Sequence, residues 1–167
     1  MSTVMTSLLI VHFSRTGGSR QLAEAARDGA AEASDVTIHY LDAGEAGPDD
    51  LLSADGYLFA CPENLAAIAG GMKEFFDSTY YPVLGRIEGR PYAAIICAGS
   101  DGENAKKQLE RICTGWRLKR IADTQVVNVA AQTPEEILGE KTIGKTALDA
   151  AHELGGALAA GLELGVF

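Results

Sequence analysis

Five short apolar runs alternate with longer segments of helical period, and this alternation constrains the fold more than any other feature of the chain. The runs occupy residues 7–13, 36–41, 56–61, 91–98 and 124–130. Three of them are almost continuously apolar, which is typical of strands covered by helices on both faces. The run at 36–41 is interrupted by Thr37 and His39, so we expect it at an edge of the sheet. Alternation of strands and helices predicts parallel pairing with right-handed crossovers, and therefore a three-layer α/β sandwich.

After four of the five runs, apolar residues recur every three or four positions, which is the spacing that places them on one face of a helix. Examples after the first, third, fourth and fifth runs are Leu22 and Ala26; Met72, Phe75 and Phe76; Leu109 and Cys113; and Leu154 and Leu158. Met72, Phe75 and Phe76 are assigned to the core. Residues 45–55 leave room for only one short turn of helix. With 167 residues the chain is long enough for one domain with a substantial core, and we assign residues 1–167 to a single domain.

Composition narrows the class of partner. The net charge is −9 and the calculated pI is 4.7, which argues against nucleic acids and anionic membranes as partners and is compatible with an ordinary solvated surface. Cys61, Cys97 and Cys113 lack any C-x-x-C or metal-ligand spacing, which indicates reduced thiols. Neither a signal peptide nor an uninterrupted apolar stretch of about 18 residues is present, so a cytoplasmic protein is expected.

In an open α/β sheet, ligands bind beyond the carboxyl ends of the strands. The first run is followed there by Ser14, Arg15, Thr16, Gly17, Gly18 and Ser19. A helix N-terminus offers unpaired amides and a partial positive charge to a phosphate, and this loop adds hydroxyl donors and glycines. It has neither the lysine of a P-loop nor a G-x-G-x-x-G pattern. The alternative is a simple strand-to-helix turn in which Ser or Thr caps the helix.

The small hydroxyl residues around Thr16 and Gly17 resemble the FMN-phosphate loop of flavodoxins and of the related NAD(P)H-dependent FMN reductases. A second segment, residues 55–82, resembles the strand, flavin loop and helix of the branch that contains FMN reductases and quinone reductases. Its matching residues are Asp55, Gly56, Pro62, Glu63, Asn64, Gly71, Lys73, Phe75, Phe76, Asp77, Tyr80, Tyr81 and Pro82.

The resemblance implies that Pro62, Glu63, Asn64 and the following Leu65 contact the isoalloxazine ring, largely through backbone amides. The family often has an aromatic residue and a glycine where this chain has Leu65 and Ala66. The alternative for residues 62–64 is a proline turn that ends the strand. The match at 80–82 could equally mark internal packing or a subunit contact.

A third loop follows the fourth run and includes Gly99, Ser100, Asp101 and Gly102. It resembles the family's second flavin-flanking loop. The alternative is a strand-to-helix turn with Ser100 or Asp101 as N-cap. The resemblance spans most of residues 7–130, and it implies a flavodoxin-like five-stranded parallel sheet with strand order 2-1-3-4-5.

Bound FMN would carry the redox chemistry, so we expect no separate catalytic residue. No second ligand stands at helical or hairpin spacing from His39 or His152, so we expect no metal site. His12 lies inside an apolar run and is expected to be structural, whereas His39 and His152 are expected far from the three loops. Neither flavin loop contains Phe, Tyr or Trp, which favours an accessible ring. We therefore expect an NAD(P)H-dependent oxidoreductase that passes electrons from NADH or NADPH through FMN to a quinone or a similar acceptor.

Two alternatives remain open at this point. The first is an electron carrier of the flavodoxin type, which the acidic charge suits. The second is a flavodoxin-like binding domain without flavin, since one fold hosts many functions. The expected partner is a small-molecule or protein redox partner, and the apolar segment 65–82 and the glycine-rich C-terminal segment could support a homodimer.

Overall fold

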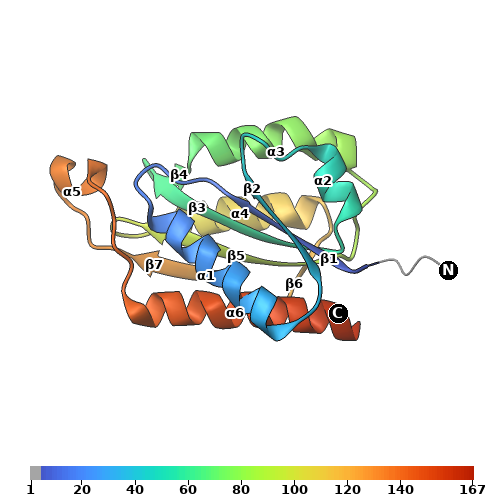
Figure 1. The fold of residues 1–167 in the computed structure, drawn as a ribbon. Coiled ribbons are helices and arrows are strands. Elements are labelled where there is room, and N and C mark those ends of the chain that lie inside the picture. The colour runs from blue at the N-terminus through green and yellow to red at the C-terminus, as the bar shows by residue number, and fades with distance from the viewer. Residues whose placement is uncertain (1–4) are drawn as a thin grey trace.

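A mainly parallel sheet with helices on both faces is formed by residues 5–167, which are the residues that the computed structural model describes (Figure 1). Its principal strands are β1 (Ser7–His12), β2 (Thr37–Asp42), β3 (Gly56–Asn64), β5 (Pro91–Ala98) and β7 (Gln125–Asn128). These correspond to the five predicted runs. They lie in the order β2-β1-β3-β5-β7, all parallel, which confirms the predicted order 2-1-3-4-5 and the edge position of β2.

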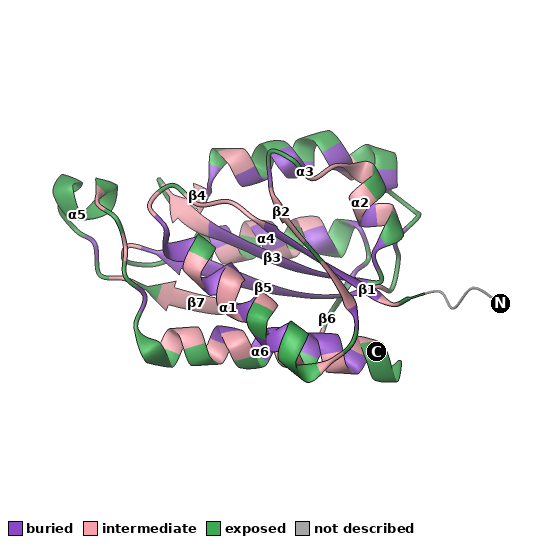
Figure 2. Cartoon of the chain, in the orientation of Figure 1, coloured by how far each residue is buried: buried purple, intermediate pink, exposed green. Residues whose placement is uncertain are grey.

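The helices form two outer layers (Figure 1). Helices α1 (Gly18–Ala33) and α6 (Lys145–Leu164) cover one face, and α2 (Pro48–Ser53), α3 (Gly70–Val83) and α4 (Glu103–Gly115) cover the other. The short α2 occupies the abbreviated crossover expected at 45–55. The central strands β1, β3 and β5 are buried along most of their length, whereas β2 and β7 are only partly buried, as Figure 2 shows.

Three small elements were not predicted. Strand β4 (Ala67–Ile68) pairs antiparallel with the end of β3, and β6 (Lys119–Arg120) pairs with the start of β5. Helix α5 (Pro134–Leu138) lies beyond the carboxyl ends of the strands, where Figure 1 shows it projecting from the body of the molecule. Two of these elements, β4 and α5, therefore stand at the end of the sheet where a ligand is expected.

Each face of the sheet has its own core. On the side of α3 and α4, Phe59 packs against Phe75, Phe76 and Tyr92 with ring centroids 5.4–6.3 Å apart. On the side of α1 and α6, the core consists of aliphatic residues such as Leu22. The assignment of Met72, Phe75 and Phe76 to the core is confirmed, since all three are at most 2% exposed.

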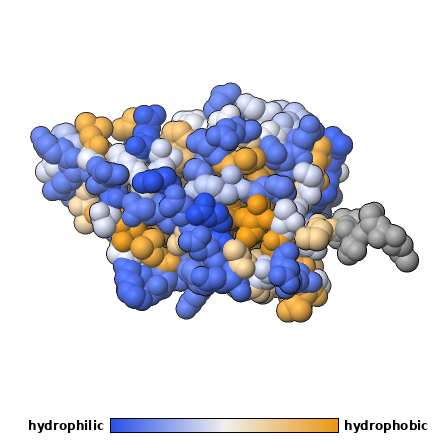
Figure 3. Space-filling view, viewed as in Figure 1, coloured by the Kyte–Doolittle hydropathy of each residue, from blue (hydrophilic) through white to orange (hydrophobic). Residues whose placement is uncertain are grey.

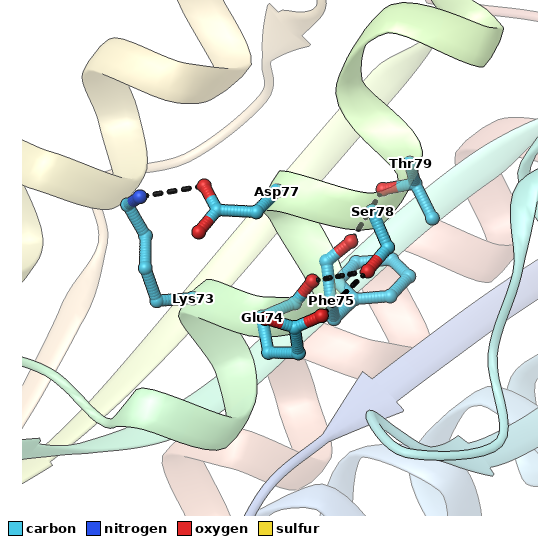
Figure 4. A network of polar contacts seen from close by, with 6 residues as sticks. All are labelled: Lys73, Glu74, Phe75, Asp77, Ser78 and Thr79. Carbon is cyan, nitrogen blue, oxygen red and sulfur yellow. Dashed lines mark hydrogen bonds and ion pairs between the residues drawn. The ribbon is translucent and has the colours of Figure 1, made fainter.

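Helix α3 satisfies its polar side chains within its own turns (Figure 4). The buried Thr79 hydroxyl donates to the Phe75 carbonyl at 2.7 Å, and the Ser78 hydroxyl donates to the Glu74 carbonyl at 2.8 Å. Lys73 forms an i,i+4 ion pair with Asp77 at 2.6 Å. The helix can therefore bury its apolar side against the sheet without leaving an unpaired hydroxyl there.

Charged and polar side chains cover most of the surface in Figure 3, with apolar side chains showing between them. The exposed apolar residues include Leu65 in the β3–β4 turn and Ile137 and Leu138 of α5. Among residues 5–167, no helix has both the length and the hydropathy that a membrane crossing requires.

Candidate functional site

The three loops singled out in the sequence meet at one pocket of about 870 Å³, hereafter the larger pocket. Its lining residues are Ser14, Arg15, Thr16, Gly18, Ser19, Pro62, Glu63, Asn64, Leu65, Ala66, Gly70, Cys97, Ala98, Gly99, Ser100, Val129, Ala131, Ile137, Leu138 and Lys141. This set includes all but three of the fourteen candidate residues. Gly17 lines a neighbouring pocket instead, and Asp101 and Gly102 line neither.

The first loop turns into α1 at Gly17, whose φ of 91° lies in the left-handed region that a side chain disfavours. The Gly17 N–H donates to the Ser14 hydroxyl at 3.0 Å, which holds the loop closed. The helix has no side-chain cap, so the alternative of a simple turn with a Ser or Thr N-cap is wrong. The amides of its first turn lack intrahelical partners, as at every helix N-terminus.

Ser19 is the most informative residue of this loop. It is 3% exposed, it lines the larger pocket, and its hydroxyl has no hydrogen-bond partner within residues 5–167. A buried hydroxyl is normally paired, and leaving it unpaired is costly. An anion held at the first turn of α1 would give this donor a partner.

The second and third loops are joined by Glu63. Its Oε1 accepts the Gly102 N–H at 2.9 Å, and its Oε2 accepts the Ala105 N–H at 3.2 Å. Gly102, with a φ of 90°, is the N-cap residue of α4, so the alternative with Ser100 or Asp101 as N-cap is wrong. A carboxylate from β3 therefore caps α4, where the helix dipole favours a negative charge.

A tight hairpin follows at the rim of the larger pocket. Its two turn residues, Leu65 and Ala66, have φ values of 51° and 60°, although neither is a glycine or an asparagine. The amide of Asn104 donates to the Ala66 carbonyl, and the Ile68 N–H donates to Gln108 Oε1 at 2.9 Å. Two side chains of α4 thus hold the hairpin in a conformation that its own residues disfavour.

A fourth wall comes from the segment after α5, which the sequence analysis missed. Lys141 Nζ donates to the carbonyls of Ile137 at 2.9 Å and Gly139 at 2.5 Å, and lies 3.3 Å from the Thr16 hydroxyl. The Lys141 N–H also donates to the Thr16 carbonyl at 2.8 Å. Gln21 fixes the segment, since it donates to the Lys141 carbonyl at 2.7 Å and accepts the Ile143 N–H at 3.0 Å.

Cys97 lies in the floor of the larger pocket at the end of β5, close to the first turn of α1. A Cβ placed on Gly18 would come within 2.8 Å of its sulfur. Burial raises the pKa of the Cys97 thiol to about 11, although the ammonium of Lys141 acts in the opposite direction. The thiol is therefore protonated near neutral pH and is poorly suited to act as a nucleophile.

The smaller pocket, of about 450 Å³, lies on the other side of the first loop. It is lined by His12, Ser14, Arg15, Thr16, Gly17, Arg20, Asp42, Leu138 and Glu140. The rings of His12 and Tyr40 are stacked with their centroids 4.4 Å apart. Burial lowers the pKa of His12, although the nearby carboxylate of Asp42 acts in the opposite direction. His39 and His152 line neither pocket, and His152 instead lies 2.8 Å from Glu32.

Together these features form a cleft that can hold an elongated anion. One end provides helix amides, hydroxyls and the Lys141 ammonium, and the other provides backbone and small side chains of the second and third loops. None of the residues that line the larger pocket is aromatic. Within residues 5–167 there is no group of three or more His, Cys, Asp and Glu side chains placed to hold a metal ion.

Comparisons with known proteins find similar sequences and similar folds. The family model of the NADPH-dependent FMN reductases matches residues 48–133, which is more than half of the chain. A flavodoxin from Aquifex aeolicus (strain VF5) is 32% identical over 100 residues, which make up 59% of this chain and 53% of that protein. The match thus spans about half the length of this curated relative.

Solved structures show the same fold. An archaeal flavodoxin superposes with a TM-score of 0.76 at 16% identity, over 94% of this chain and 99% of that one. An FMN-dependent NADH-azoreductase from Bacillus anthracis str. Ames Ancestor superposes with a TM-score of 0.68 at 15% identity, over 92% of this chain and 100% of that one.

Proposed function

Since this chain belongs to the NADPH-dependent FMN reductase family, we propose that the larger pocket binds FMN and that the protein transfers electrons from NADPH or NADH to a small acceptor such as a quinone. The site residues proposed are those of the three loops, together with Lys141. Free thiols at Cys61, Cys97 and Cys113 fit a protein of the cytoplasm, the compartment that we propose.

The observation that carries this proposal is the unpaired Ser19 hydroxyl beside the first turn of α1. A phosphate monoester at this point would accept from Ser19, from Thr16 and from the free amides of the helix. Lys141 Nζ, which has no carboxylate within 4.0 Å among residues 5–167, would add a charge next to it. The residues present therefore fit the phosphate of FMN.

The isoalloxazine ring would then lie against Pro62–Leu65 and Gly99–Ser100. Bound FMN supplies the redox chemistry, and the chain holds and orients it. The Glu63 bridge to Gly102 and Ala105 fixes the spacing of the two loops that would flank the ring. The lining includes no Phe, Tyr or Trp, which favours access of a nicotinamide and then of an acceptor to the same pocket.

A spectrum and one anaerobic titration test the proposal. The purified protein, or the protein reconstituted with added flavin, should show flavin absorbance, and denaturation should release FMN. Anaerobic mixing with NADPH or NADH should bleach the flavin band rapidly, and a quinone should restore it. A protein that stays colourless in the presence of FMN would overturn the proposal.

A flavodoxin-type carrier is the second candidate, because the curated relative is a flavodoxin and the net charge is −9. A carrier needs no direct reaction with a nicotinamide. If neither NADPH nor NADH bleaches the bound flavin within minutes while dithionite does so at once, the carrier is the better description.

A further inference from the structure

The smaller pocket is a second cavity beside the larger pocket, in which FMN is proposed to bind. It shares Ser14, Arg15, Thr16 and Leu138 with the larger pocket, so the phosphate loop and one residue of α5 form a common wall. A ligand whose phosphate group lies at this wall could therefore extend into both pockets.

Two guanidinium groups line the smaller pocket without a counter-ion. Neither Arg15 nor Arg20 has a carboxylate within 4.0 Å among residues 5–167. The Arg20 side chain folds back over the start of α1, because a Cβ placed on Gly17 would lie 3.1 Å from its Nη2. Two unpaired cations beside a helix N-terminus favour a ligand with more than one negative charge.

The same pocket also contains carboxylates, which exclude a simple phosphate site. Asp42 and Glu140 line it together with the two arginines. One carboxylate oxygen of Asp42 accepts the Gly44 N–H at 3.1 Å, which leaves the other for a hydroxyl donor. Carboxylates repel phosphate but accept hydrogen bonds from sugar hydroxyls. The mixed lining therefore suits a ribose that carries a phosphate.

The position of these residues in the sheet agrees with this chemistry. His12 ends β1 and Asp42 ends the neighbouring β2, and their Cα atoms are partners in the parallel register. In doubly wound sheets that bind dinucleotides, the loop after the first strand holds the diphosphate, and an acidic residue about 20 residues further on binds the ribose. Asp42 and the loop at 14–19 have this arrangement, although the loop lacks the G-x-G-x-x-G sequence.

We propose that the smaller pocket binds the adenosine 5′-phosphate part of a dinucleotide, with Arg15 and Arg20 on its phosphates and Asp42 on its ribose. The rest of the dinucleotide reaches the larger pocket, and in this respect the inference rests on the proposed function. Two ligands share this chemistry, namely FAD as an alternative to FMN and the nicotinamide dinucleotide that donates electrons.

The first test uses 5′-AMP as the probe. It is titrated calorimetrically into the protein with and without bound FMN, and the same is done for Asp42→Asn, Arg20→Gln and the control Arg86→Gln. Arg86 is exposed beyond α3 and lines neither pocket. We expect binding to weaken about tenfold or more in the two pocket variants, because each loses a charge-assisted hydrogen bond. The control should bind like the wild type.

The proposal is overturned if 5′-AMP binds to neither form of the protein at about 1 mM, or if Asp42→Asn and Arg20→Gln bind it as tightly as the wild type. Flavin absorbance reports separately on the proposed function. A protein that takes up no flavin but binds 5′-AMP through Asp42 contradicts the FMN site and supports the smaller pocket.

The second test identifies the source of the adenylate. If FAD is the ligand, the flavin-free protein binds FAD more tightly than FMN, and Asp42→Asn removes that difference while its FMN affinity stays unchanged. If the ligand is the electron donor, FAD has no advantage. In that case Asp42→Asn raises the KM for the nicotinamide dinucleotide, and 5′-AMP competes with this substrate. An Asp42→Asn variant that changes neither property would contradict both assignments.

Discussion

The carboxylate of Glu63, near the end of β3, accepts the Gly102 N–H at the start of α4 with an N···O distance of 2.9 Å. Its second oxygen accepts the Ala105 N–H at 3.2 Å. One side chain thus joins two of the three pocket loops and caps a helix whose N-cap residue, Gly102, has no side chain. The distance between the two loops therefore depends on Glu63.

Replacing Glu63 by alanine should lower the free energy of unfolding by about 1–2 kcal/mol, because α4 loses its cap and the negative charge at its N-terminus. Glu63→Gln keeps a hydrogen-bond acceptor, so its free energy of unfolding should fall by less than that of Glu63→Ala. Urea unfolding measures both, with Glu88→Ala as the control, since Glu88 is an exposed acidic residue outside both pockets. Equal stabilities for wild type and Glu63→Ala would contradict the role of the cap.

This relationship shows how far the sequence analysis could go at the site. It could place Glu63 and Gly102 at the same edge of the sheet, because both follow parallel strands that it recognised. It could not pair them, since hydrogen bonds between residues 39 apart in sequence follow from the detailed path of the loops. For the cap of α4 it offered only Ser100 or Asp101, as part of the alternative to a flavin loop, because a local residue is the usual N-cap.

Ser19→Ala should separate stability from binding. Removing a buried hydroxyl that lacks a partner should leave the unfolding free energy of the flavin-free protein unchanged or raise it by about 1 kcal/mol. Affinity for FMN should fall by about 1.5–3 kcal/mol if the hydroxyl donates to its phosphate. Riboflavin, which lacks the phosphate, should bind both proteins equally. A parallel loss for riboflavin would show that Ser19 acts on the structure of the pocket instead.

Ala66→Gly should stabilise the protein by about 1 kcal/mol, because Ala66 has a φ of 60° that costs an alanine more than a glycine. Urea unfolding would measure the gain. The control is Ala25→Gly within α1, where the same exchange should destabilise by about 1 kcal/mol. A loss of stability for Ala66→Gly would mean that the methyl group of Ala66 matters more than its backbone conformation.

The strained hairpin also explains why β4 was not predicted. Two-residue hairpins are recognised by Asn-Gly or Asp-Gly, and Leu65-Ala66 provides no such signal. Helix α5 did have a signal, because Thr133 precedes Pro134 and its hydroxyl accepts the Glu136 N–H at 3.2 Å. A five-residue helix is too short for periodicity to detect. The long elements, whose apolar spacing repeats several times, were predicted, and the short ones that complete the site were not.

Cys97 should make stability depend on pH at the alkaline end. Its folded pKa is about 11, whereas an unfolded thiol titrates near about 8.5. Between these values the unfolded chain loses a proton that the folded chain keeps, so stability is full below about pH 8.5 and falls as the pH rises towards 11. Urea unfolding at about pH 8 and about pH 10.5 measures this loss of stability. The loss between the two pH values should be roughly 2 kcal/mol smaller in Cys97→Ala than in the wild type. Val127→Ala, a control without a titrating group, should leave the loss unchanged, and an equal loss in Cys97→Ala would exclude the thiol as its source.

Lys141 should act on the phosphate end of the flavin and not on the ring. Its ammonium donates to two carbonyl groups, those of Ile137 and Gly139, and lies 3.3 Å from the Thr16 hydroxyl. Lys141→Met should weaken FMN binding about tenfold or more, because a charged partner of the phosphate is lost, and should leave riboflavin binding unchanged. Added salt should weaken FMN binding less in the variant than in the wild type. Lys107→Met removes an exposed lysine of α4 and serves as the control for net charge. Equal effects of Lys141→Met on FMN and riboflavin would mean that Lys141 only holds α5 against the first loop.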